Sequence, residues 1–396
     1  MSQKNNKAYI ESPFEYLSES KAVAQNWYKA RVYVLYLLNH TLAGLQHLPA
    51  YWHFVIKGDS ELMLSVVRHL ALYAHFVNYE EYDKLGELSC KNRTIITLVS
   101  RKKATEIETE LKKKEVLWNL PDYCKLSLYG KTKNKDSYID IALEVVEEAK
   151  EAPQEDGIMP ITITEEEVQK WLDSKSDDIC HIDTRKAIYA DKSYELGAEI
   201  KNIPYEDINC ADRYFKAINT FHNVIYHLDS NTTLTSKWGS NIYKIRCGLS
   251  NIYCADCFEI REKELRFLAQ QDYTTPKNVL RKWIENMPRA QKKRELKALQ
   301  NHIKEFAHSE HNRWVVERLI LGFRPLGKKE KLEYEHLFTH QRADYLSKLK
   351  KEAEAPQHID ICSNKELRRV DPDNMRYDSF LMLAIPLIMK KVRNND

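Results

Sequence analysis

The sequence predicts an α/β protein with a parallel sheet, followed by a mainly helical C-terminal region. Residues 52–57 are an apolar run of strand length, Gly58-Asp59-Ser60 interrupts it, and helical periodicity follows over 61–72. A strand, a glycine turn and a helix in this order open a doubly wound fold. Similar alternation continues along the chain, and a long helical stretch with a glycine near its end lies at 306–324.

Length and composition exclude several classes of protein. The 396 residues suffice for two or three domains, and the formal net charge of +3, from 61 basic and 58 acidic residues, argues against nucleic acid as the main partner. The apolar stretches at 31–47 and 381–389 are interrupted or too short to cross a membrane. The eight scattered cysteines and the polar start without a signal sequence indicate a reduced, cytoplasmic protein.

We divide the chain into five parts. These are N-terminal helices at 1–50, a Rossmann-like domain at 51–150, a linker at 151–177, a second Rossmann-like half at 178–287 and a C-terminal domain at 288–396. In the first half we expect strands at 52–57, 75–79, 94–99 and 125–129 and helices at 61–72, 104–116 and 138–150. In the second we expect strands at 178–183, 223–228 and 243–246 and helices at 185–197 and 259–270.

The turn at Gly58 occupies the position of a dinucleotide-binding loop. Such a loop uses three glycines, and only the first is present in Gly58-x-Ser60-x-x-Met63. Ser60, as a helix N-cap, would leave N–H groups for a phosphate, whereas Asp59 would oppose an anion. Gly58 and Ser60 are therefore the cofactor-binding candidates, the cofactor itself stays unknown, and a degenerate structural or ligand-sensing domain is preferred over nicotinamide chemistry.

A Cys-x-x-Cys pair suggests either a metal site or buried thiols. Cys254 and Cys257 form the pair, with Cys247 seven residues before the first of them. A structural zinc site needs four ligands, and no second pair of this kind is present. We favour buried free cysteines and assign no metal, leaving open whether these three residues bind one.

The helix at 306–324 has two faces. At about 100° per residue, one face is apolar and the opposite face carries Trp314 among ionic residues. The apolar residues are Val315, Val316, Leu319 and Ile320, and the ionic ones are Glu310, His311, Glu317 and Arg318. Trp314 could stack on a planar ligand, or it could cap a second hydrophobic contact while Arg313 pairs with Glu310 or Glu317 along the helix.

The same stretch resembles a known family. Ala307-x-x-Glu310-His311-x-Arg313-Trp314-x-x-x-Arg318-x-x-x-Gly322-Phe323 is similar to the first half of the ryanodine-receptor repeat (RyR) domain, which also occurs in bacterial proteins. The later His358-x-x-Ile361, Leu367, Arg376-Tyr377-Asp378 and Ile385-Pro386-Leu387 resemble its closing segment. The resemblance covers about residues 298–392. Phe323, Pro325-Leu326 and Asn364 depart from the family's aromatic positions.

The resemblance implies a ligand sensor. The fold pattern around Gly58 also resembles the NAD-binding regulatory domain of TrkA-type potassium-uptake proteins, which some bacterial RyR-domain proteins carry. Together these imply recognition of a nucleotide-derived or similar planar anionic molecule, in bacterial stress or antiphage signalling. The implied ligand-binding residues are Glu310, His311, Trp314, Arg318, Arg324, Tyr377 and Asp378, with Trp314 stacking, the two arginines holding negative charge and the others hydrogen-bonding.

Two other classes of function stay open. One is an NAD-linked or nucleotide-hydrolysing enzyme acting near Gly58 and Asp229, although no paired acid and base stands at a recognisable spacing. The other is an oligomeric scaffold, with the N-terminal helices as the subunit interface.

Overall fold

The computed structural model describes residues 21–43, 45, 49–84, 87–133, 137–147, 160–174, 304–352, 354–371 and 378, together with single residues between 249 and 264. The predicted second Rossmann-like half at 178–287 therefore lies almost wholly outside the described residues. The same holds for Tyr377.

A six-stranded sheet is the centre of the described structure, with strand order β6-β5-β7-β4-β1-β8. All neighbouring strands pair in parallel except β5 with β6. The strands are β1 (His53–Lys57), β4 (Thr94–Val99), β5 (Lys125–Leu128), β6 (Lys131–Thr132), β7 (Ile141–Val146) and β8 (Ile161–Thr164). The predicted α/β class with a mostly parallel sheet is confirmed.

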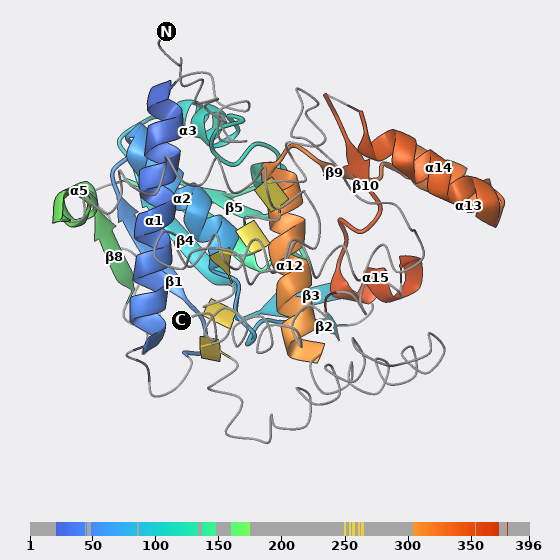
Figure 1. Ribbon diagram of the computed structural model, residues 1–396, viewed down its shortest axis with the longest axis horizontal. Helices are drawn as coiled ribbons and strands as arrows, with labels where there is room; N and C mark the ends of the chain where they lie inside the picture. The colour runs from blue at the N-terminus through green and yellow to red at the C-terminus, as the bar shows by residue number, and fades with distance from the viewer. Residues whose placement is uncertain are drawn as a thin grey trace, which may run out of the picture.

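One face of this sheet forms the main hydrophobic core. Phe54 and Ile56 of β1 and Ile96 and Leu98 of β4 point to this face and are buried, since alternate residues of a strand share a face. The helices α1 (Lys21–Ala43) and α2 (Glu61–Tyr73) pack on each other and contribute to the same core (Figure 1). Every residue of α2 after Glu61 is buried.

Three expected elements differ from the structure. The 138–150 segment was expected as a helix but contains β7, because a near-continuous apolar run is typical of an interior parallel strand as well as of a buried helix. The expected strand at 75–79 is a loop, where the ring of His75 bonds to the Asp140 carboxylate and to the Ala71 carbonyl. Residues 161–174, placed in a linker, form β8 and α5 (Glu165–Ser174), and β8 pairs directly with β1.

Smaller elements complete the α/β part. The helix expected at 104–116 ends earlier, as α3 (Ala104–Leu111), and the short α4 (Leu120–Tyr123) precedes β5. The hairpin of β2 (Glu80–Lys84) and β3 (Glu87–Lys91) is a separate two-stranded sheet between α2 and β4. Among the helices of the described part, α1 included, none combines the length and the apolar character that a bilayer crossing requires.

The C-terminal region packs on the α/β part through α12 (Lys304–Ile320). Val315, Val316, Leu319 and Ile320 belong to the same hydrophobic core as the sheet, which confirms the predicted apolar face. The helix ends as predicted before Gly322, whose φ of +86° is the left-handed conformation typical of a helix stop. In Figure 1, α12 stands on the side of the sheet away from β8 and α5.

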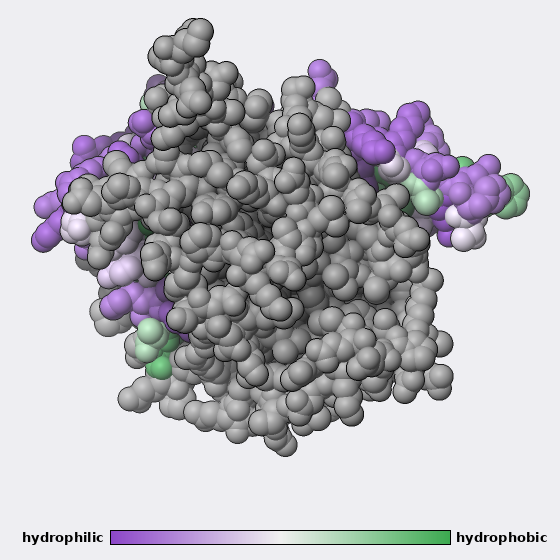
Figure 2. Space-filling model, in the orientation of Figure 1, coloured by the Kyte–Doolittle hydropathy of each residue, from purple (hydrophilic) through white to green (hydrophobic). Residues whose placement is uncertain are grey.

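The remaining C-terminal elements lie on one side of α12 (Figure 1). They are β9 (Arg324–Pro325), α13 (Lys328–His336), α14 (Thr339–Lys350), β10 (Gln357–His358) and α15 (Asn364–Val370). Strands β9 and β10 pair in parallel, and α13 and α14 project from them as an arm. The surface of this arm is mostly hydrophilic, with hydrophobic atoms towards its far end (Figure 2).

Candidate functional site

Three of the predicted ligand-binding residues form a ladder along one face of α12. His311, Trp314 and Arg318 are three and four residues apart, so they project from the same side of the helix. The imidazole of His311 is nearly parallel to the indole, with 6.2 Å between ring centroids and 19° between ring planes. The guanidinium carbon of Arg318 lies 5.1 Å from the indole centroid. Trp314 is half-buried in this ladder.

Arg318 is held between two aromatic rings. Its guanidinium carbon is also 5.2 Å from the centroid of the Phe323 ring, and 12% of its side chain is exposed. One Nη donates to the hydroxyl of Ser250 over 3.0 Å. A carboxylate oxygen of Glu317 lies 3.6 Å from Nε, which is too far for a hydrogen bond. Within the described part of the chain, buried Nε has no hydrogen-bond partner.

The β9 and β10 pair brings a second histidine to the ladder. His358, in β10, contacts Trp314 edge to face with 4.8 Å between ring centroids, and its ring is 6.5 Å from that of Phe323. Burial lowers the pKa of His358 well below its ordinary value, so the ring is neutral at pH 7. Neither His358 nor Phe323 was among the predicted ligand-binding residues. Both residues stand in the motifs that resemble the RyR domain. That resemblance was the one signal in the sequence that could have identified them as site residues.

His311 faces a carboxyl group at the inner end of the ladder. Its Nε2 is 3.0 Å from the Cys362 carbonyl oxygen, and its Nδ1 is 3.7 Å from the carboxyl of Asp378. Burial lowers the pKa of His311 to about 4 and raises the pKa of Asp378 well above its usual value. His311 therefore lies close to both Trp314 and Asp378, and burial favours the neutral form of the two titratable groups.

Glu310 belongs to a different environment. Its carboxylate accepts hydrogen bonds from Arg313 over 2.8 and 2.9 Å, and Arg313 also donates to Glu317 over 2.6 Å. All three side chains are at least 97% buried. Although burial opposes the charge, the two carboxylates raise the pKa of Arg313 well above its ordinary value. The intrahelical pairing considered as an alternative to ligand binding is thus formed, and it engages Glu310.

The other predicted residues do not join the ladder. Arg324 is exposed in β9, where its backbone N–H donates to the Pro356 carbonyl over 2.9 Å. Tyr377 lies outside the described residues. The structure therefore brings together His311, Trp314, Arg318 and Asp378 from the predicted set.

No family model, curated protein or solved structure matches this chain. The resemblances to the RyR domain and to TrkA-type domains stay expectations from sequence motifs.

The turn after β1 has the geometry expected of it but a different electrostatic character. Gly58 has a φ of +118°, and Ser60 caps α2, accepting from the Met63 N–H over 3.4 Å. However, the Ser60 hydroxyl donates to the carboxylate of Glu165 over 2.8 Å, and Asp59 lies beside it in the turn. Two carboxylates at this helix N-terminus repel a phosphate, so the geometry disfavours an anionic cofactor at Gly58 and Ser60.

The two thiols of the Cys-x-x-Cys pair are buried. Cys254 contacts Glu310, with 3.6 Å between sulfur and carboxylate oxygen, and burial raises the pKa of the Cys254 thiol well above its ordinary value. Cys257 is likewise buried, and burial raises its pKa to about 12. Cys247 lies outside the described residues. Among those described, no three His, Cys, Asp or Glu side chains are grouped to hold a metal ion.

Proposed function

We propose that this chain is a binding protein and that the ladder on α12 recognises a small, planar, anionic ligand of the nucleotide type. The observation that carries the proposal is Arg318. Its cation lies between Trp314 and Phe323, and its buried Nε has no hydrogen-bond partner among the described residues. An anion that approaches the exposed part of this guanidinium supplies a charged acceptor, and charge-assisted hydrogen bonds of this kind are strong.

The ring system around Arg318 supports a planar ligand rather than a simple anion. Trp314 is half-buried, so part of the indole is available to a second ring. His311 and His358 are neutral. The Nε2–H of His311 donates to the Cys362 carbonyl, which leaves its Nδ1 as an acceptor, and the Nδ1 of His358 accepts from the Asp360 N–H, which leaves its Nε2–H as a donor toward a base. A planar base can pack against the indole and hydrogen-bond to the imidazoles, and an attached phosphate can pair with Arg318.

The enzyme alternative has less support. It depends on the Gly58 turn, where Ser60 already donates to the carboxylate of Glu165. The buried His311 and the partly exposed Asp378, whose pKa is raised, are compatible with binding and require no reaction. Signalling in stress or antiphage defence stays part of the proposal as its biological context.

Calorimetry with a matched pair of arginine variants tests the proposal. We would titrate NAD, ADP-ribose and cyclic AMP into the wild type, into Arg318→Gln and into Arg342→Gln. Arg342 also lies over an aromatic ring, 4.9 Å from the Tyr334 centroid, but it belongs to the α13 and α14 arm. At least one nucleotide should bind the wild type and Arg342→Gln equally, and Arg318→Gln at least about tenfold more weakly.

A further inference from the structure

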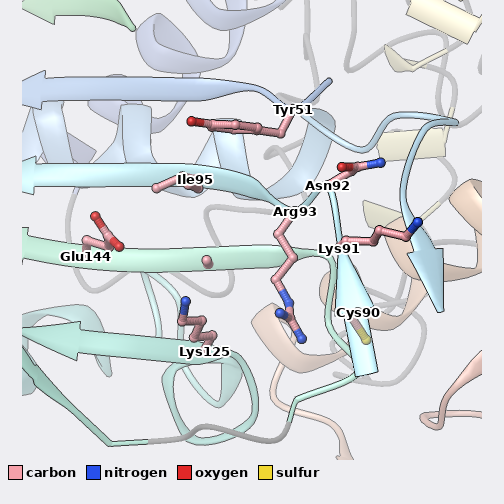
Figure 3. A pocket seen from close by; sticks show the side chains of 9 residues that line it. Tyr51, Cys90, Lys91, Asn92, Arg93, Ile95, Lys125 and Glu144 are labelled. Carbon is pink, nitrogen blue, oxygen red and sulfur yellow. The ribbon is translucent and has the colours of Figure 1, made fainter. Parts of the chain in front are cut away.

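The second face of the sheet carries a separate pocket. While one face is apolar, the same alternation places His53, Thr97 and Glu144 on the opposite face. A cavity of about 150 Å³ opens there at the amino ends of the strands. Figure 3 shows Arg93 just before β4, Lys125 on β5 and Glu144 further along β7.

Glu144 is unexpected at its position. It lies within β7, an interior strand between β5 and β4, where both faces of a parallel sheet are usually apolar. The carboxylate is half-buried, and placing a charge there is costly unless it is paired. A role in binding explains why an acidic residue is tolerated in this strand.

Two buried side chains fix the Glu144 carboxylate. The Thr97 hydroxyl donates to it over 3.3 Å, and His53 Nε2 is 2.9 Å from the same hydroxyl. Because Thr97 has a single O–H, which it donates to Glu144, it must accept from the Nε2–H of His53. Thr97 is fully buried, His53 is 6% exposed, and Glu144 lines the cavity. The two buried side chains therefore fix the carboxylate from the protein interior, and its exposed side borders the cavity.

Two cationic side chains, Arg93 and Lys125, also line the pocket. Arg93 is anchored by the Ile139 carbonyl over 3.0 Å and by the Ser137 carbonyl, both of them neutral acceptors. Lys125 lines the cavity from β5, and the described part of the chain shows no carboxylate paired with either cation. Ile95 and Ala142, which face each other in register on β4 and β7, supply an apolar floor between the charges.

We propose that this pocket binds a small zwitterion of the amino-acid type. Its ammonium group pairs with Glu144, its carboxylate pairs with Lys125 and Arg93, and a small side chain lies on the floor formed by Ile95 and Ala142. The volume limits the ligand, since an engineered cavity of roughly this size holds one benzene molecule. None of the residues that line this pocket belongs to the ladder on α12, and a mononucleotide is too large to enter the pocket completely.

Calorimetry with small probes tests the assignment. We would titrate glycine, L-alanine and L-serine into the wild type, with propionate and ethylamine as probes that carry only one of the two charges. At least one amino acid should bind, at least about tenfold more tightly than either single-charge probe. Glu144→Gln and Lys125→Met should each weaken that binding by at least about tenfold.

The controls match the charge changes at exposed positions of α5. Glu166→Gln and Lys170→Met should retain wild-type affinity, because both side chains are exposed and neither lines the pocket. Arg318→Gln should also retain it, which separates this site from the proposed nucleotide site. Absence of amino-acid binding at millimolar concentration, equal binding of propionate, or unchanged binding by Glu144→Gln would each overturn the assignment.

Discussion

The indole of Trp118 packs directly against Gly322, so that a β-carbon on this glycine would lie 2.7 Å from the ring. Trp118 precedes α4 in the α/β part, and Gly322 terminates α12. Next to this contact, the Asn119 side chain donates to the Phe323 carbonyl over 3.0 Å. The C-terminal end of α12 is therefore fixed against the α/β part by packing and by a hydrogen bond.

Gly322→Ala should destabilise the protein strongly. The substitution combines a left-handed backbone, which costs about 1–2 kcal/mol, with a steric clash that costs about 1–3 kcal/mol more. Gly130→Ala is the matched control, because its φ is +82° and nothing lies within 4 Å of the added carbon. Urea denaturation should show the larger loss for Gly322→Ala. Equal losses in the two variants would contradict the packing against Trp118.

Arg313→Met should also destabilise the protein. It leaves the buried carboxylates of Glu310 and Glu317 without their cation, and breaking a buried pair in this way costs about 3–5 kcal/mol. Arg369→Met is the control, because Arg369 is 74% exposed and its 3.8 Å ion pair with Glu366 contributes at most about 1 kcal/mol. Chemical denaturation of both variants measures the difference. If Arg313→Met lost no more stability than Arg369→Met, the buried ion pairs of Arg313 with Glu310 and Glu317 would not be needed to stabilise the fold.

Stability should fall as the pH drops from about 6.5 to about 4. In this interval the unfolded chain protonates His311 and the folded chain does not, because burial lowers its folded pKa from 6.5 to about 4. This contribution amounts to up to about 3 kcal/mol. Asp378 acts in the opposite direction, since its raised folded pKa adds stability at low pH that is lost as the pH rises.

The comparison of His311→Gln with the wild type isolates the imidazole. Free energies of unfolding at pH 7 and pH 4.5 should differ less in the variant than in the wild type, and His340→Gln, at an exposed site, should keep the wild-type difference. A pH dependence that is identical in His311→Gln and the wild type would mean that His311 is already protonated in the folded protein.

Ser60→Ala should reduce stability without changing nucleotide affinity. Loss of the N-cap and of the hydrogen bond to Glu165 should cost about 0.5–2 kcal/mol. Thermal unfolding measures the stability, and calorimetry measures the affinity. Weaker nucleotide binding by Ser60→Ala would return the Gly58 turn to consideration as a cofactor site.

The sequence was most informative where a local pattern of apolar residues is compatible with only one kind of secondary structure. The run His53–Lys57 before a glycine, and the amphipathic stretch before Gly322, could each be assigned from periodicity and stop signals. Ile141–Val146 could not, because its apolar residues suit a buried strand and a buried helix equally and only the pairing with β4 and β5 decides.

The candidate site was predictable in part for a similar reason. Helical spacing alone places His311, Trp314 and Arg318 on one face. It does not show that Arg313 draws Glu310 into the interior, nor that the pairing of β9 with β10 carries His358 to the indole. The pair of Arg313 with Glu310 is itself local, but its burial, like the approach of His358 to the indole, depends on contacts between distant parts of the chain.

Calorimetric titration of NAD, ADP-ribose and cyclic AMP into the wild type and Arg318→Gln is the most direct test of ligand recognition by α12. Binding of at least one nucleotide to the wild type, weakened at least about tenfold by Arg318→Gln and unaffected by Arg342→Gln, is the predicted result. No binding to the wild type, or equal affinities for the wild type and Arg318→Gln, would contradict it.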